Sequence, residues 1–445
     1  MNDSFDPRSY GAVADGHSKD TAAVQAAIDA AAAQGGTVRL AGGTFVCGTL
    51  YLKSNVALEI TNSATLLASP DIADYGTDTH HNRYRNEPEL DRCFLFAQDA
   101  ENVTICGSGV IDGNAAAFPN AGSIYRPMLL RVLRCRNVRI QNLRLLNAAA
   151  WTTAFLDSDF IWATDLHIEN HRNYNGDGLD FDGCRHVWVR GCYIDGTDDN
   201  LCLQSSGLPV QDVHISDCAF TSVCAGIRIG LKSIGGISGV VISNCTMRNV
   251  WREGIKLECT EGGSITDILV ENVTMHNVRR PIFAILNNRY RPDDLGSSVE
   301  LDHIPPIGTM ARLRFVGITA VDDEGMAHAQ RRFDNDIMGE PRFGGCRLDA
   351  NAAHPIEDVT IRDFWYTAFG GVRLADLPAA PYPEVPDRLQ APTTPGSENY
   401  YPDWSRTTHL DARNVRGLTL ENLHFNTLHP DERPKMRTEG PTVML

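Results

Sequence analysis

Two short motifs rich in glycine and carboxylates hold the residues best suited to chemistry in this chain. Residues 175–180 read Asn-Gly-Asp-Gly-Leu-Asp, and residues 196–200 read Gly-Thr-Asp-Asp-Asn. Hydrolysis of a glycosidic bond needs a protonated acid for the leaving oxygen and an ionised carboxylate that acts on water or on the anomeric carbon. Crowded carboxylates repel one another, which raises the pKa of at least one and keeps a proton available near neutral pH. We therefore predict that Asp177, Asp198 and Asp199 form a hydrolytic site.

The spacing of these aspartates indicates which element must position them. Asp177 and Asp198 are 21 residues apart, slightly less than one coil of a chain whose coils stack about 4.8 Å apart. Neighbouring coils would then place both carboxylates on one face. Side chains alternate along a strand, so Asp198 and Asp199 can share a site only at a bend or bulge, which Gly196 and Thr197 permit. The alternative is that these aspartates are ordinary polar turn residues.

A repeat in the sequence supplies such coils. Short segments that alternate polar and apolar residues recur, and those that start at residues 186, 212, 239 and 267 are 26, 27 and 28 residues apart. The alternation predicts strands with one buried face, and a period in the twenties predicts stacked coils. Further short strands in each coil favour a parallel β-helix over a leucine-rich horseshoe. The segments are 102–105, 137–140, 186–189, 212–215, 239–242 and 267–270, with later members at 358–361 and 417–420.

We therefore predict an all-β fold, a single right-handed parallel β-helix that spans residues 1–445 as one domain. Residues 1–69 would form an N-terminal cap and the first coils, because residues 20–34 are rich in alanine and place Val24 and Ile28 on one helical face. Asp20 is the expected N-cap of this capping helix, which would close the open end of the core. Four stretches break the period and are predicted long loops that shape the binding face: residues 70–98, 286–311, 322–357 and 376–406.

Turn residues after the strands explain several polar residues and cysteines without chemistry. Asn and Asp tolerate a left-handed backbone, so those that follow successive strands are expected to form a ladder at a corner of the coils. The apolar position next to this ladder holds Cys192, Cys218 and Cys245, which would stack inside the helix. The twelve cysteines lack a Cys-x-x-Cys pair or a zinc-type spacing, so we expect mainly buried thiols and neither a metal nor another cofactor.

The charge balance limits the classes of partner. The chain has 56 acidic and 40 basic residues and a formal net charge of -16, which argues against nucleic acid or an anionic membrane as the main partner. We see neither an apolar run long enough for a membrane span nor a secretory signal. We therefore expect a cytoplasmic protein, or a secreted or periplasmic one from which a signal was removed. A monomer or a weak homo-oligomer is expected.

The motifs at 175–178 and 198–199 resemble those of the polygalacturonase family, family 28 of the glycoside hydrolases. Other similar segments are 9–16, 35–38, 42–45, 66–69, 109–113, 126–127 and 147–151, so the resemblance covers roughly residues 5–290 of a divergent member. It implies a pectate-lyase-like β-helix that hydrolyses pectin-type chains, galacturonan-like or rhamnogalacturonan-like, with inversion at the anomeric carbon. Asp198 would be the general acid, and Asp177 with Asp199 would position and activate the water.

The resemblance also implies substrate-binding residues. Asn175 belongs to the first motif, Lys256 looks like the family lysine that binds a galacturonate carboxylate, and Tyr290 falls where the family places a substrate-contacting tyrosine. Trp151 could stack on the apolar face of a sugar, or it could be a core residue. The long loops suggest action on oligosaccharides from the chain end.

Two departures from the family motifs affect substrate recognition. The Gly-His-Gly motif is replaced by residues 224–226, Cys-Ala-Gly, and the Arg-Ile-Lys motif by residues 254–256, Gly-Ile-Lys. A lysine cannot replace the bidentate binding of a carboxylate by arginine. Arg228 could supply a cation from the neighbouring coil, or it could be a solvated outward side chain. Rhamnogalacturonan-type members also depart at the histidine motif, which makes a branched or mixed pectic substrate an alternative.

Two other functions remain open at this point. A β-helical polysaccharide lyase would abstract a proton next to a uronate carboxylate with a lysine or arginine base, usually with Ca²⁺, and Lys256 makes this conceivable. A carbohydrate-binding β-helix that has lost activity would explain the missing histidine and arginine. The retained trio of aspartates counts against the second alternative, because binding alone does not require it.

Overall fold

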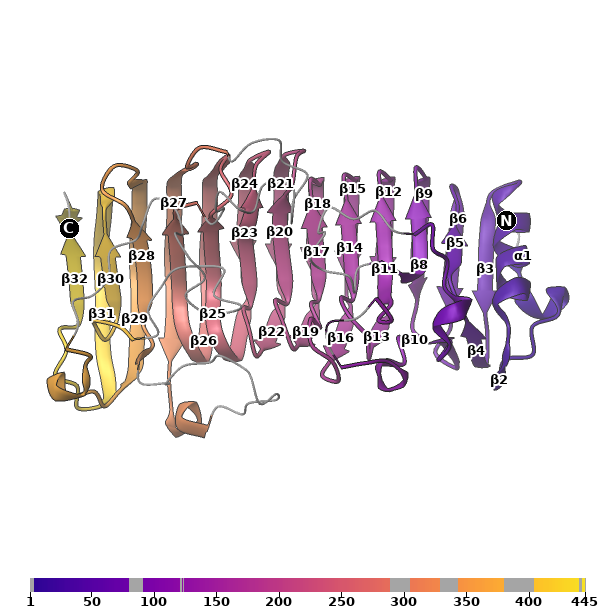
Figure 1. Cartoon of the computed structure of the whole chain (residues 1–445), viewed down its shortest axis with the longest axis horizontal. Helices are drawn as coiled ribbons and strands as arrows, with labels where there is room; N and C mark the ends of the chain where they lie inside the picture. Colours follow the sequence, from indigo (N-terminus) through magenta and orange to yellow (C-terminus); the bar gives the residue numbers. More distant parts are fainter. Residues whose placement is uncertain are drawn as a thin grey trace. The chain divides into compact units, whose positions relative to one another are not determined.

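A computed structural model describes residues 4–79, 91–120, 122, 124–288, 305–328, 343–379, 404–439 and 442–444 of the chain. The chain divides into two compact units, Met1–Asp198 and Asp199–Leu445, and within each unit parallel strands stack coil upon coil (Figure 1). Crossover connections between parallel strands are almost always right-handed. The predicted all-β, right-handed parallel β-helix is confirmed, whereas the extent of one domain over residues 1–445 stays a prediction.

The first unit has three parallel sheets, which we call A, B and C in the order in which each coil visits them. Sheet A contains β1 Ser4–Phe5, β3 Gly36–Leu40, β6 Val56–Ile60, β9 Glu101–Gly107, β12 Arg136–Gln141, β15 Asp159–Thr164 and β18 Arg185–Arg190. Sheet B contains β2 Asp15–Lys19, β4 Gly43–Cys47, β7 Ala64–Ala68, β10 Val110–Asp112, β13 Arg144–Leu146, β16 His167–Asn170 and β19 Tyr193–Gly196. Sheet C contains β5 Leu50–Leu52, β8 Cys93–Gln98, β11 Met128–Leu133, β14 Thr153–Leu156 and β17 Leu179–Asp182.

The second unit uses longer strands that continue around the corners of its coils. β25 Thr246–Cys259 pairs with both β22 Ala219–Ser222 and β23 Ile227–Ser233, and β26 Ser264–Leu286 pairs with β24 Ile237–Ser243 and with β25. The other strands are β20 Leu201–Ser205, β21 Val210–Ser216, β27 Thr309–Val321, β28 Cys346–Ala350, β29 Ile356–Gly370, β30 Leu410–Arg413, β31 Val415–His429, β32 Met436–Glu439 and β33 Thr442–Met444.

Ladders of Asn side chains occur at two places. The ladder of Asn244 and Asn272 lies at the turn positions that the repeat predicts, whereas the ladder of Asn55, Asn102 and Asn137 lies where strands begin and was not predicted. In the first unit, Asn102 and Asn137 have φ values of 56° and 58°. The Asn137 Nδ2 donates to Asn102 Oδ1 at 2.5 Å, and Asn102 Nδ2 donates to Asn55 Oδ1 at 2.8 Å. In the second unit, Asn272 Nδ2 donates to Asn244 Oδ1 at 2.7 Å. The left-handed conformation that Asn tolerates therefore turns the chain at the same place in successive coils.

The predicted capping helix is present as α1, Thr21–Ala32, and it buries Val24 and Ile28. Asp20 is at the N-cap, as predicted, but its side chain makes no capping hydrogen bond. Its carboxylate instead accepts hydrogen bonds from the backbone N–H groups of Val13 and Ala14, at 2.7 and 3.0 Å. These bonds satisfy a buried acid by tying the preceding loop to the start of the helix.

Two predicted loops contain strands. β8 falls within 70–98 and β28 within 322–357. Every residue of β28 is buried, as is every residue of β8 except Gln98. β8 therefore lacks the polar and apolar alternation of a half-buried strand, whereas β28 alternates but buries its polar residues Arg347 and Asp349 as well. Parts of the four predicted loops lie outside the described residues.

All twelve cysteines are described, and they are thiols rather than disulfides, eleven of them buried. This confirms their predicted role as small core residues. In the part of the chain that the structure describes, none of the helices is long and apolar enough to cross a bilayer.

Candidate active site

One corner of the first unit carries the two predicted motifs. It lies between sheets B and C, where each coil passes from one sheet to the next. The connection from β16 to β17 contains Asp177, and Asp198 follows β19 directly. Because β16 and β19 are paired in register, with Asn170 opposite Gly196, the two motifs leave sheet B on consecutive coils. The strand register therefore places Asp177 and Asp198 on neighbouring coils, as predicted.

Hydrogen bonds from residues of earlier coils hold the Asp177 turn in place. Thr152 donates to the Asp177 carbonyl oxygen from both its backbone N–H, at 3.0 Å, and its hydroxyl, at 2.6 Å. Arg126, whose side chain is fully buried, donates to Tyr174 O at 2.6 Å and to Asn175 Oδ1 at 2.7 Å. Asn175 itself is half-buried with a φ of 55°, so its side chain shapes the turn through Arg126. A contact of Asn175 with substrate stays a prediction.

Thr197 joins the Asp177 turn to the Asp198 turn. Its hydroxyl accepts a hydrogen bond from Gly176 N at 3.1 Å and donates to Asn173 O at 2.5 Å. A Cβ on Gly176 would lie 2.5 Å from the same hydroxyl, so glycine is needed at this position. Sequence reasoning treated Thr197 only as part of the bend and gave Arg126 no role, because both act through contacts between coils.

Replacement of Thr197 by valine is expected to lower kcat and to reduce the free energy of unfolding by about 1–3 kcal/mol. Valine keeps the shape of the side chain but leaves the buried Gly176 N–H and Asn173 carbonyl without the hydroxyl. Urea unfolding and steady-state kinetics would measure the two effects. Thr197→Ser retains the hydroxyl and should behave nearly like the wild type, whereas equal losses in both variants would contradict the linking role.

The exposures of the two aspartates in this unit differ in a way that suits different roles. Asp177 is buried, with an exposed fraction of 2%. Asp198 is half-buried and lies in a bend after Gly196, outside regular strand structure. The bend that the sequence predicts is therefore present. A side chain that must reach a glycosidic oxygen needs the greater exposure, and a side chain that only orients water does not.

Asp199 begins the second unit, and its environment is dominated by cations. Its Oδ2 lies 2.6 Å from an Arg228 guanidinium nitrogen, and its Oδ1 accepts a hydrogen bond from Ala225 N at 3.3 Å. The Asp199 side chain is fully buried, and the Arg228 side chain has an exposed fraction of only 13%. The structure therefore does not support the alternative of Arg228 as a solvated outward side chain.

The ion pair with Arg228 determines the charge of Asp199. Burial by itself raises the pKa of this carboxyl, but the Arg228, Lys256 and Arg252 cations outweigh burial and hold the pKa below its ordinary value. We expected crowding among the aspartates to raise at least one pKa. For Asp199 the shift is in the opposite direction, because its cationic neighbours prevail. An ionised Asp199 can accept a proton but cannot donate one.

Lys256 is a register partner of Arg228 on the next coil, and it is itself surrounded by carboxylates. Its Nζ lies 3.4 Å from Glu258 Oε1 and 3.7 Å from Glu253 Oε2, and its side chain has an exposed fraction of 3%. Arg280 also pairs with Glu253, at 3.0 Å. Arg228 and Lys256 thus lie on neighbouring coils, as one of the two alternatives for Arg228 requires, but the two glutamates were missed.

The two glutamates differ in their charge states. Burial raises the pKa of Glu253, yet Arg252, Lys256 and Arg280 together lower it to about 2. Burial raises the pKa of Glu258 above its ordinary value despite Lys256 and Arg228. A signal for this network was present in the sequence, because Lys256 and Glu258 are two apart on one strand and share a face.

The predicted substrate contacts of Trp151 and Tyr290 also stay predictions. Trp151 has an exposed fraction of 5% and packs in an apolar cluster with Phe96 and Met128, which fits the core alternative. Tyr290 lies outside the described residues.

Comparisons with known proteins concern the family and the fold of the chain. A family model described as Glycosyl hydrolases family 28 matches residues 44–300. A probable polygalacturonase of Vitis vinifera is 28% identical over 262 residues, which are 52% of this chain and 52% of the relative. An exo-poly-alpha-D-galacturonosidase of Dickeya chrysanthemi is 24% identical over 294 residues, which are 53% of this chain and 48% of the relative. The chain thus spans about half the length of these relatives.

Solved structures share the fold. A hyperthermoactive exopolygalacturonase from Thermotoga maritima superposes with a TM-score of 0.66 at 20% identity, covering 83% of this chain and 88% of that one. A family 28 exopolygalacturonase of Yersinia enterocolitica gives a TM-score of 0.71 at 17% identity, covering 100% of this chain and 77% of that one. At these identities the similarity concerns the β-helix alone.

Proposed function

We infer the reaction from one premise, which is that this chain belongs to family 28 of the glycosyl hydrolases. We propose that it hydrolyses glycosidic bonds of a pectin-type poly- or oligosaccharide with inversion of configuration. The names of its relatives, a polygalacturonase and an exo-poly-alpha-D-galacturonosidase, support a galacturonate-containing substrate. The exo-type relative also supports cleavage from a chain end.

The observation that carries this proposal is the environment of Asp199. A fully buried carboxylate that is kept ionised by Arg228 is suited to removing a proton from water. Asp198, its neighbour in the chain, is half-buried and suited to donating a proton to the leaving oxygen. One ionised base and one more exposed acid are the pair that an inverting hydrolase requires.

The proposed reaction has one chemical step. Asp198 gives its proton to the glycosidic oxygen as the bond from that oxygen to the anomeric carbon breaks. Water attacks the anomeric carbon from the opposite face and passes a proton to Asp199, while Asp177 accepts a hydrogen bond from the same water and orients it. The products are a sugar with inverted anomeric configuration and a shortened alcohol. Asp198 is left ionised and Asp199 protonated, and the starting state returns when Asp199 releases its proton to solvent and Asp198 takes one up.

A lyase mechanism with Lys256 as the base is less well supported. A basic lysine must be uncharged when it removes the proton, whereas the ion pairs of Lys256 with Glu253 and Glu258 favour the charged amine. The same pairs leave Lys256 suited to orienting an anionic group of a substrate.

Incubation of the protein with defined pectic oligosaccharides tests the proposal. We expect release of reducing ends, no ultraviolet-absorbing unsaturated product, and the same rate after treatment with a chelator. Proton NMR of the first product should show the inverted anomer before mutarotation. Unsaturated products would support the lyase, and binding in calorimetry without any cleavage across the panel would support a non-catalytic protein.

A further inference from the structure

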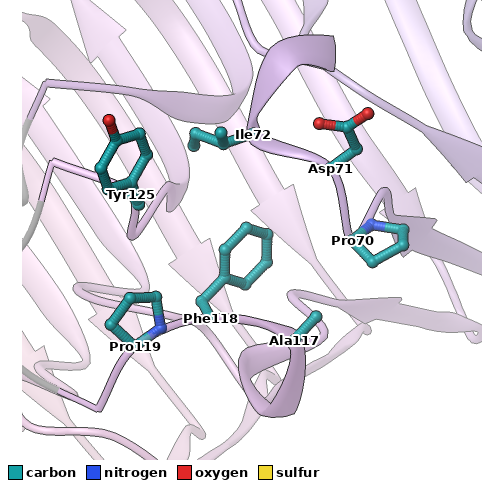
Figure 2. A pocket seen from close by; sticks show the side chains of 7 residues that line it. All are labelled: Pro70, Asp71, Ile72, Ala117, Phe118, Pro119 and Tyr125. Atoms are coloured by element: carbon teal, nitrogen blue, oxygen red, sulfur yellow. The ribbon is translucent and has the colours of Figure 1, made fainter.

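A pocket in the first unit lies on the same corner as Asp177 and Asp198. It has a volume of about 360 Å³, within the range of small-molecule sites. One wall is the start of the connection from β7 to β8, and the other is the connection from β10 to β11. Figure 2 shows the Phe118 ring in the middle of the side chains that line it. The lining residues are Pro70, Asp71, Ile72, Ala117, Phe118, Pro119 and Tyr125.

The strand register relates this pocket to the Asp177 turn. In sheet B, β10 pairs with β13 and β13 pairs with β16, so the pocket wall after β10 lies two coils from the turn after β16. Two coils correspond to about 10 Å along the stack. A short oligosaccharide running along the corner can span that distance.

Direct hydrogen bonds also join the pocket wall to the Asp177 turn. Tyr174 N donates to Asn120 O at 2.9 Å, and Arg126 binds Tyr174 O and Asn175 Oδ1. Asn120 and Arg126 flank Tyr125 and Pro119 in the wall of the pocket. The pocket is therefore built onto the turn that holds Asp177 rather than onto an unrelated surface.

Aromatic rings give the pocket a firm apolar floor and an accessible edge. The Phe118 ring packs edge-on against buried Tyr75, with ring centroids 6.0 Å apart, and Tyr75 packs edge-on against Phe94. Tyr125 has an exposed fraction of 52%, so its ring is accessible to a ligand. An exposed ring beside a fixed ring suits the apolar face of a sugar.

The charges around the pocket disfavour a uronate. Its lining residues, all of them described, include the carboxyl of Asp71 but no lysine, arginine or histidine. The Asp71 carboxylate accepts a hydrogen bond from Ala73 N at 3.0 Å and lies 3.7 Å from Lys19 Nζ, which pairs more closely with Asp74 at 2.8 Å. A sugar carboxylate placed here would be repelled by Asp71, whereas a methyl group would contact Ile72, Phe118 and the prolines.

We propose that this pocket is a distal subsite that binds an uncharged, methyl-bearing sugar unit of the substrate chain. Two pectic sources present that chemistry, a 6-deoxyhexose and a methyl-esterified uronate. The inference rests on the proposed function, because it concerns the chain that Asp198 would cleave. The inference adds that at least one sugar unit of the bound substrate chain is not an unmodified galacturonate.

Tyr125→Ala tests the subsite, with Tyr125→Phe as the control that keeps the ring. On long oligosaccharides with methyl-esterified uronate or 6-deoxyhexose units, Tyr125→Ala should raise KM about tenfold with kcat unchanged. On short or unesterified galacturonan oligomers the variant should match the wild type. The esterified and deoxyhexose series distinguish the two sources. An equal rise for every substrate, or no rise for any, would overturn the subsite.

Calorimetry separates failure of the subsite from failure of the hydrolase proposal. Binding of the same methyl-bearing oligosaccharides to wild type and to Tyr125→Ala does not require turnover. About tenfold weaker binding by Tyr125→Ala supports the subsite even if the protein cleaves nothing. Equal binding by both proteins overturns it even if the protein is an active hydrolase. Matching thermal melts would show that the exposed Tyr125 position does not affect folding.

Discussion

An Asp198→Asn variant is expected to lose about 10²- to 10⁴-fold in kcat and to keep a nearly unchanged KM and free energy of unfolding. The amide has almost the shape of the carboxylic acid but cannot transfer a proton to the leaving oxygen. Asp198 is half-buried in a bend, so the change removes little packing. Initial rates of reducing-end release, calorimetric binding and urea unfolding would measure the three quantities.

Asp217→Asn is the matched control for this experiment. Asp217 has a φ of 58° in a corner of the second unit, a conformation that asparagine also tolerates, and it accepts a hydrogen bond from Asn244 Nδ2 at 3.5 Å. The control should keep wild-type kcat, because it makes the same chemical change in an ordinary turn aspartate. Wild-type turnover by Asp198→Asn would mean that another group supplies the proton.

The coils could be predicted from sequence because their signals are local. Asn244 and Asn272 each follow a short alternating segment, and both have the left-handed conformation expected of the turn residues after the strands. The same reasoning failed for β8, which is buried on both faces and lacks alternation, and for β28, whose alternating polar residues Arg347 and Asp349 are buried as well. It failed for the Asp20 side chain because a helix N-cap and a loop anchor require the same residue type, and only tertiary structure decides between them.

The residues of the candidate site were predictable, but their charges were not. The spacing of glycines and aspartates is enough to locate the turns at 175–178 and 196–199. The pKa of Asp199, however, depends on Arg228 and Lys256, which come from later coils. Glu253 likewise pairs with Arg280 across a coil. Pairings between coils follow from the exact register, which the repeat length of 26 to 28 residues leaves open.

The Arg228→Met variant should show what the cation contributes. Removing one partner of a buried pair leaves an uncompensated charge, so the free energy of unfolding is expected to fall by about 3–5 kcal/mol at neutral pH. Asp199 has a lowered pKa in the folded wild type, so its ionised form stabilises the fold above the ordinary Asp pKa, and this contribution is lost as pH falls through the lowered value. The deficit of the variant should therefore shrink in acid, where Asp199 is protonated. Urea unfolding at neutral and acidic pH would measure it.

The same substitution is expected to move the acidic limb of the kcat/KM profile to higher pH, because Asp199 must be ionised to accept a proton from water. The double variant Arg228→Met with Asp199→Asn should recover most of the lost stability, since Asp199 no longer carries a buried charge without its partner, but it should not recover turnover. Recovery of stability without recovery of turnover would distinguish a base held ionised by Arg228 from an ion pair that only supports the fold. A stability deficit that is the same at neutral and acidic pH, or a double variant as unstable as the single one, would contradict this account of Asp199.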